Sequence, residues 1–420
     1  MPKDLDTGTP AGLNWAGNLA YSAARIEQPT SIDEIAHVAR TAGHVKVLGS
    51  RHSFNDVADT DGVALSLETM PGDLVIDPDA HIARVPAGWR YGRLARALDE
   101  RGWALSALAS LPHISVAGAV ATGTHGSGDA VGSLATAVAG LELIDSAGVL
   151  RRLGRGDTGF EGAVVSLGML GVIVRVELDI MPAYEMTQTV YDAPRWDAVL
   201  ADFDAVTGAG DSVSLFTSWR NPQTFDQAWV KTRGAAPLEL AGARRASGPR
   251  HPIPGADPAP ATAQGGESGR WFERLPHFRL EFTPSAGDEL QSEYLVPRGR
   301  ALEALERLRS LAGQIAPLAM ITEVRTIAAD TLWLSGAYGR DTVGIHFTWQ
   351  PREAEVRALL PRIEDELLPL GARPHWGKLF TVDAEWMPRL YPRWDDFREL
   401  TRALDPRGAF RNAYSERMGL

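Results

Sequence analysis

The sequence predicts an α+β fold with more than one domain, and three observations support this prediction. The chain has 420 residues, whereas a single hydrophobic core rarely extends beyond about 250–300 residues. Strand-like alternation is clearest over Val172–Ile180, and helical periodicity is clearest over Arg300–Ala312 and Arg352–Leu368. With 44% apolar and 23% charged residues, the composition is that of an ordinary globular enzyme.

The first predicted elements lie in the N-terminal hundred residues. Ser31 and Glu34 have the spacing of a capping box and mark the start of a helix. A short buried strand, Val45–Leu48, then runs directly into the turn Gly49–Asn55. A second helix is predicted over Tyr91–Arg101.

A hairpin and a longer strand follow. Leu141–Ile144 and Val149–Leu153 flank Ser146-Ala147-Gly148, which is a turn signature between two strands. Val172–Ile180 alternates apolar and charged residues, so it predicts a half-buried strand in an antiparallel or edge position. Because Pro182 follows this strand, we place a domain boundary there.

The boundary separates residues 1–182 from a second region that mixes strands and helices and ends in a last segment with Trp376, Trp386, Tyr391 and Trp394. Ser247–Thr262 is rich in proline, alanine and glycine, and predicts a mobile surface loop. The aromatic residues of the last segment indicate an ordered C-terminus.

The composition excludes several classes of function. A net charge of −11 disfavours nucleic acid or an anionic membrane as a partner. The absence of cysteine rules out disulfides, thiolate metal sites and cysteine nucleophiles. The polar stretch Met1–Asn14 lacks the apolar core of a signal peptide, and no segment is long and apolar enough for a membrane span. We expect a cytoplasmic monomer without a metal site.

The most distinctive chemistry-bearing stretch is rich in glycine, serine and threonine, over Pro112–Gly118 and Ala121–Gly128. Closely spaced glycines let backbone N–H groups approach an anion, so a pyrophosphate is the expected ligand. It is not a P-loop, because no lysine follows in the required place. A nicotinamide-binding Rossmann motif would need a preceding strand that is missing here, although Asp145 could serve as its acid. A plain surface loop also remains possible at this point.

His52 ends the predicted strand–turn unit. A lone histidine at a strand end is usually structural, but Gly49 and the flanking serines form a turn that would hold the imidazole out of the sheet.

Two strand-like runs carry paired polar residues. Glu323 and Arg325 lie two apart, as do His346 and Thr348, so each pair points from one face of its strand. Since buried charge is costly unless paired, the pairs indicate a pocket that binds hydroxyl groups. A solvent-facing sheet surface is the alternative. Lys378 is a further candidate.

At these residues the sequence resembles the alditol oxidases (xylitol or sorbitol oxidases), covalent flavoproteins of the vanillyl-alcohol-oxidase type. The resemblance runs from Asn14 to Asn412. Its most specific strings are Ala109–Gly128, Ser166–Ile173, Arg274–Arg298, Ala337–Val343 and Arg373–Lys378.

The resemblance implies a two-lobed FAD-binding domain, formed by residues 1–182 and 373–420, and a sheet-and-helix substrate domain, residues 183–372. It implies FAD attached covalently to His52. The implied cofactor contacts are Val47, Leu48, Gly49, Ser50, Arg51, His52, Ser53, Ser110, Ser115, Gly118, Thr122, Gly123, Thr124, His125 and a backbone group near Val172. Many relatives have glycine where this chain has Arg51.

The resemblance also implies the substrate site and the reaction. Ser110, Glu323, Arg325, Thr348 and Lys378 would hold the polyol, with His346 close by. We expect oxidation of a terminal hydroxyl of xylitol or sorbitol, with O2 reduced to H2O2. Arg325 and Lys378 would stabilise the developing alkoxide and His346 would accept the proton. The alternatives are an aldonolactone oxidase or dehydrogenase, a nicotinamide enzyme and a non-enzymatic binding module.

Overall fold

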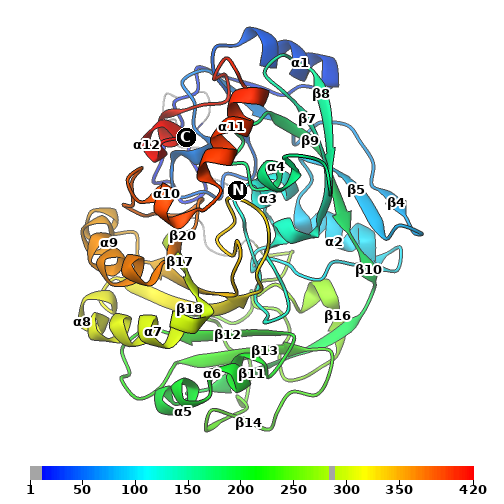
Figure 1. Cartoon of the computed structure of the whole chain (residues 1–420). Helices are drawn as coiled ribbons and strands as arrows, with labels where there is room; N and C mark the ends of the chain where they lie inside the picture. Colours follow the sequence, from blue (N-terminus) through cyan, green and yellow to red (C-terminus); the bar gives the residue numbers. More distant parts are fainter. Residues whose placement is uncertain (1–11, 283–288) are drawn as a thin grey trace.

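The computed structural model describes residues 12–282 and 289–420. Most of the polar stretch Met1–Asn14 and part of the string Arg274–Arg298 therefore lie outside the described residues. Helices and sheets are mixed as the sequence predicts, and Figure 1 shows them in an upper part and a lower part. The α+β prediction is confirmed.

The upper part contains two sheets. A parallel sheet has the order β1-β3-β2, and an antiparallel sheet has the order β4-β5-β9-β7-β8. The strands are β1 (Arg25–Glu27), β2 (Val45–Leu48), β3 (Val63–Ser66), β4 (Val75–Asp77), β5 (Ile82–Pro86), β7 (Val138–Ile144), β8 (Leu150–Gly154) and β9 (Val172–Asp179), with a short pair β6 (Trp103–Ala104) and β10 (Met181–Pro182). The helices are α1 (Ile32–Thr41), α2 (Tyr91–Asp99), α3 (Val116–Ala121) and α4 (Phe160–Val164).

Local sequence signals explain several of these elements. The Ser31 hydroxyl accepts a hydrogen bond from the Glu34 N–H at 3.2 Å and so caps α1. The Glu34 carboxylate accepts from the N–H of Thr30, one residue before the expected partner, so the capping box is only half formed. The hairpin β7–β8 is confirmed.

Val172–Ile180 takes the antiparallel one of the two expected placements and is not an edge strand. β9 pairs antiparallel with β5 on one side and β7 on the other, so it lies in the centre of its sheet. The charged face is tolerated there because Glu177 is buried but ion-paired with Arg84 at 3.0 Å and Arg152 at 2.9 Å.

The lower part is built on one large sheet of order β16-β11-β13-β12-β18-β19-β17-β20, whose pairings are all antiparallel. Its strands are β11 (Glu185–Asp192), β12 (Ser212–Thr217), β13 (Gln227–Thr232), β16 (Gly269–Arg270), β17 (Leu290–Pro297), β18 (Ala319–Ile327), β19 (Thr342–Trp349) and β20 (Arg373–Pro374), beside a small hairpin of β14 (Glu239–Leu240) and β15 (Ala243–Arg244). The helices are α5 (Trp196–Ala201), α6 (Phe203–Thr207), α7 (Ala301–Ser310), α8 (Ala312–Ile315) and α9 (Glu353–Leu367).

After β20 the chain returns to the upper part. The C-terminal helices α10 (Met387–Leu390), α11 (Trp394–Leu404) and α12 (Ala413–Met418), orange to red in Figure 1, lie beside the elements of the first half. Trp376, Tyr391 and Trp394 pack together, and they share one hydrophobic core with α1, α2 and the β5, β7 and β9 strands.

The segment Ser247–Thr262 contains no helix or strand, as the sequence predicts. It is not only a surface loop, because Pro252 is buried and both Pro252 and Ile253 line the main cavity. Within residues 12–282 and 289–420, the helices are all too short or too polar to cross a membrane.

Candidate active site

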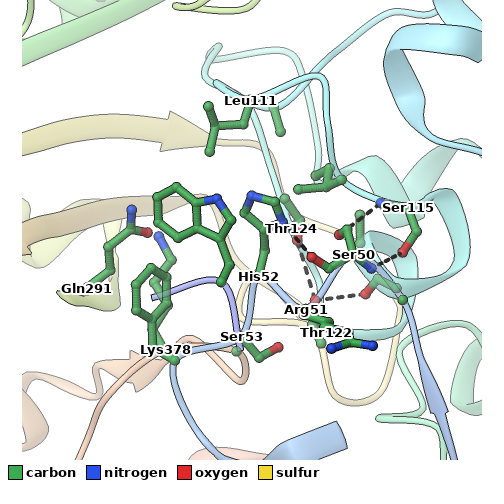
Figure 2. Close-up of a pocket in the computed structure, with 18 of the residues that line it drawn as sticks. Ser50, Arg51, His52, Ser53, Leu111, Ser115, Thr122, Thr124, Gln291 and Lys378 are labelled. Carbon is green, nitrogen blue, oxygen red and sulfur yellow. Dashed lines mark hydrogen bonds between the residues drawn. The ribbon is translucent and has the colours of Figure 1, made fainter. Parts of the chain in front are cut away.

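One cavity of about 370 Å³ connects the glycine-rich loops of the upper part with the large sheet of the lower part. Figure 2 shows His52 in the middle of it, with Ser50, Ser115 and Thr122 on one side and Gln291 and Lys378 on the other. Segments from the first half, the large sheet and the C-terminal segment all contribute to its wall. A cavity of this size with convergent polar groups is typical of a ligand site.

The cavity brings together most of the residues that the sequence singled out. Lining it are Val47, Leu48, Gly49, Ser50, Arg51, His52, Ser53, Ser110, Ser115, Gly118, Thr122, Thr124, His125, Glu323, Arg325, His346, Thr348 and Lys378. Gly123 and Val172 are not part of the lining, although Gly171 and Ile173 beside Val172 are.

The glycines act through close approach of two loops. A Cβ atom on Gly49 would lie 2.4 Å from the Ser115 hydroxyl, and one on Gly118 would lie 2.6 Å from the same atom. The loops are joined because the Ser115 N–H donates to the Ser50 hydroxyl at 3.1 Å. This cradle of backbone N–H and hydroxyl groups fits a pyrophosphate.

The glycine-rich stretch is not a Rossmann motif. It contains the short helix α3 and is followed by β7, which belongs to an antiparallel sheet. A Rossmann motif needs a parallel strand–helix–strand unit, so the nicotinamide alternative is not supported.

Arg51 adopts a left-handed conformation with φ of 61°. Glycine enters that region at no steric cost, whereas other residues rarely do. The conformation gives a physical reason for the glycine that the family resemblance led us to expect at this position. The Arg51 guanidinium lies 5.9 Å from the centre of the Tyr21 ring.

His52 is held between its own turn and the N-terminal segment. Its Nδ1 lies 3.0 Å from the Ser50 carbonyl oxygen, and its ring stacks on Trp15 with centroids 4.9 Å apart. Burial lowers the pKa of His52 to about 4. The imidazole is therefore neutral near pH 7.

A buried carboxylate, Glu293 on β17, joins the two predicted catalytic cations. Its Oε1 lies 2.7 Å from Arg325 Nη2 and 3.1 Å from His125 Nε2, and its Oε2 lies 2.9 Å from Lys378 Nζ. Burial alone raises the pKa of Glu293, but Lys378 and Arg325 together hold it well below its usual range. His125 thus belongs to this cluster, at the end of the cavity formed by the large sheet.

Glu323 and His346 face each other across β18 and β19, a pairing that the spacing within each strand did not predict. Glu323 Oε2 lies 3.8 Å from His346 Nδ1 and 3.7 Å from Arg325 Nε. Burial raises the pKa of Glu323, but Arg325 and His277 outweigh it and hold this pKa well below its usual range. Burial, and then Lys378, lower the pKa of His346 to about 4. His346 Nε2 and Arg325 Nε have no hydrogen-bond partner within the described residues, so both are available to a ligand.

Sequence reasoning missed Glu293, Trp15 and His277. Glu293 lies two residues after Gln291 on the same face of β17, so the spacing used for β18 and β19 could have found it. His277 lies in a segment without helix or strand periodicity and offered no such signal.

Comparison with known proteins agrees with this geometry. A family model described as FAD binding domain matches residues 23–154, and one described as D-arabinono-1,4-lactone oxidase matches residues 288–418. Two solved cholesterol oxidases, one a solvent-stable enzyme and one from B. sterolicum, have TM-scores of 0.78 at 16% and 14% sequence identity, each over 99–100% of both chains. The fold and site therefore define an FAD-dependent oxidoreductase with the vanillyl-alcohol-oxidase type of fold.

The curated relatives identify the family within this class. An alditol oxidase from Streptomyces is 46% identical over 96% of this chain and 98% of its own length. L-gulono-1,4-lactone dehydrogenase from Mycobacterium tuberculosis is 29% identical over 98% and 99%, and L-gulonolactone oxidase from mouse is 26% identical over 96% and 97%. The chain belongs to the alditol oxidase family.

Proposed function

We propose that the enzyme oxidises the terminal hydroxyl of an acyclic polyol, such as xylitol or sorbitol, with FAD linked covalently to His52 and with O2 reduced to H2O2. The observation that carries the substrate class is the polar wall formed by Glu323, Arg325, Thr348 and Lys378 at one end of the cavity. When bound, FAD supplies the acceptor for the hydride of the alcohol carbon and passes the two electrons on to O2.

The residues of the chain have separate tasks in this proposal. Arg325 and Lys378 stabilise the negative charge that develops on the alcohol oxygen. His346 is the proposed proton acceptor: it is neutral near pH 7, and its Nε2 has no hydrogen-bond partner within the described residues. Glu323 and Thr348, with Ser110 opposite, bind neighbouring hydroxyls and make the terminal carbon the reacting one.

The proposal includes the division of the chain into a FAD-binding domain, residues 1–182 and 373–420, and a substrate domain, residues 183–372. The shared core of the first and last segments supports this division. A cytoplasmic monomer without a nucleic-acid partner remains our expectation from composition. Lactone oxidation is the second candidate, favoured by the family model that matches residues 288–418.

His52→Ala should abolish covalent flavin attachment, because no other group replaces the neutral imidazole in the turn after β2. After acid precipitation we expect the wild-type pellet to keep the flavin absorbance and the His52→Ala pellet to lose it. His113→Ala, which changes a histidine of the glycine-rich stretch that does not line the cavity, should retain the flavin. Free FAD in the wild-type supernatant would show that the linkage is wrong.

Acyclic polyols should be oxidised far more efficiently than simple alkanols. A buried site that hydrogen-bonds substrate hydroxyls leaves its own polar groups unpaired when those hydroxyls are missing, and rejects such analogues by as much as about 10⁴-fold. The measurement is kcat/KM for xylitol and for 1-butanol by peroxide release. Equal values would contradict a hydroxyl-binding pocket.

A further inference from the structure

Lys231 on β13 is a buried lysine to which the proposed reaction assigns no task, and burial lowers its pKa to about 7. It is 1% exposed. Its Nζ donates hydrogen bonds to the carbonyl oxygens of Leu275 and Pro276, and lies 3.0 Å from His277 Nδ1. An ammonium has three N–H donors, so each of them has an acceptor here.

The far side of the same histidine reaches the substrate pocket. His277 Nε2 lies 2.7 Å from Glu323 Oε1, and His277 is 5% exposed. A carboxylate can only accept hydrogen bonds, so Nε2 must carry the proton that is shared with Glu323. In a neutral imidazole Nδ1 is then an acceptor, and the Lys231 ammonium is the donor that satisfies it. The two hydrogen bonds therefore run in one direction, with Lys231 donating to His277 and His277 donating to Glu323.

This direction determines which Glu323 oxygen meets the substrate. Oε1 is used by His277, whereas the nearest cationic or imidazole groups to Oε2 are Arg325 Nε at 3.7 Å and His346 Nδ1 at 3.8 Å. Both distances exceed hydrogen-bond length, which leaves Oε2 able to accept from a hydroxyl. The backbone N–H of His277 donates to the Ser110 carbonyl at 3.1 Å, so the segment that Lys231 holds contacts the opposite wall of the pocket.

We propose that Lys231 and His277 are positioning residues that orient Glu323 as a hydroxyl acceptor and thereby set the affinity for polyols. The inference rests on the proposed function. Neither residue takes part in the chemical step. Lys231 acts through His277, and His277 acts through Glu323. His277 occupies Oε1 of Glu323, so Oε2 stays available to a substrate hydroxyl.

The test compares Lys231→Met, His277→Leu and His277→Gln with wild type in anaerobic stopped-flow experiments with xylitol. Lys231→Met and His277→Leu should raise the xylitol concentration for half-maximal reduction by about 10- to 100-fold, the range for a buried hydrogen bond to a charged group. The limiting rate and the flavin content should change little. His277→Gln should recover most of the affinity, because its side-chain amide places an N–H near the imidazole Nε2 position.

Two further measurements separate positioning from general loosening of the sheet. Tyr294→Phe removes a buried 2.8 Å hydrogen bond to Glu364 from the same sheet, and should leave xylitol affinity unchanged. In protein with ¹⁵N-labelled histidine, Lys231→Met should move the titration of His277 to higher pH, because the neighbouring cation that opposes its protonation is gone.

The outcomes are distinct. Wild-type xylitol affinity in His277→Leu would overturn the inference. A loss of xylitol affinity in Tyr294→Phe as large as that in His277→Leu would also overturn it. In both cases the proposed function stands as long as the wild-type enzyme oxidises xylitol. If Lys231→Met does not fold, the pair His277→Leu and His277→Gln decides. A wild-type enzyme that does not oxidise polyols contradicts the proposed function, and the inference with it.

Discussion

Replacing Arg325 or Lys378 with alanine is expected to slow the bleaching of flavin absorbance by saturating polyol about 10²- to 10³-fold, with covalent flavin retained. An alcohol that loses hydride must bear growing negative charge on its oxygen. Fixed cations in a buried pocket stabilise that charge more in the transition state than in the ground state. Arg325 and Lys378 are both nearly buried, with side chains 7% and 13% exposed.

Arg325→Lys should restore little of the lost rate. Arg325 Nη2 bonds Glu293 while Nε remains available toward the cavity, and a single ammonium cannot reproduce both contacts. The measurement is anaerobic stopped-flow reduction. If both alanine variants reach the wild-type limiting rate and only need more substrate, these residues bind the ground state and their electrostatic role is wrong.

Replacing Glu293 should have the largest effect on stability. Glu293→Ala removes the carboxylate shared by Arg325 and Lys378, and leaving buried charges without their partner costs about 3–5 kcal/mol. We expect a loss of that size in the free energy of unfolding, measured by chemical denaturation. Glu364→Ala is the control, because Glu364 is also buried but accepts only from neutral groups.

Glu293→Gln keeps the shape and tests the electrostatics. Burial lowers the pKa of Lys378, and the negative charge of Glu293 raises it. Without that charge Lys378 loses its proton at lower pH. Because the reaction needs the cation, activity falls as pH rises through this pKa, so the alkaline limb of the pH–rate profile should move to lower pH. An unmoved limb would show that Glu293 does not govern Lys378.

The local elements near the site were predictable from short-range patterns. β2 has the predicted bounds Val45–Leu48, because apolar residues between a helix end and a glycine turn leave little alternative. The polar pairs on β18 and β19 were predictable from their spacing of two. The central position of β9 was not, since Glu177 is tolerated there only through arginines on β5 and β8 that pairing brings close.

The missed site residues depend on contacts between distant segments. Glu293 meets Arg325, Lys378 and His125 only after β17, β18, the C-terminal segment and the glycine-rich stretch have come together. Trp15 reaches His52 by stacking from the N-terminal segment. Spacing within β17 could mark Glu293 as a residue of the polar face, but no periodicity in one sequence encodes which distant residues it contacts.

The most direct test of the proposed substrate class is peroxide release in air-saturated buffer with xylitol, sorbitol and L-gulono-1,4-lactone under identical conditions. The polar wall of Glu323, Arg325, Thr348 and Lys378 predicts kcat/KM for the polyols at least about tenfold above that for the lactone. A lactone oxidised as efficiently as xylitol, or polyols consumed without peroxide, would contradict the proposed polyol oxidase.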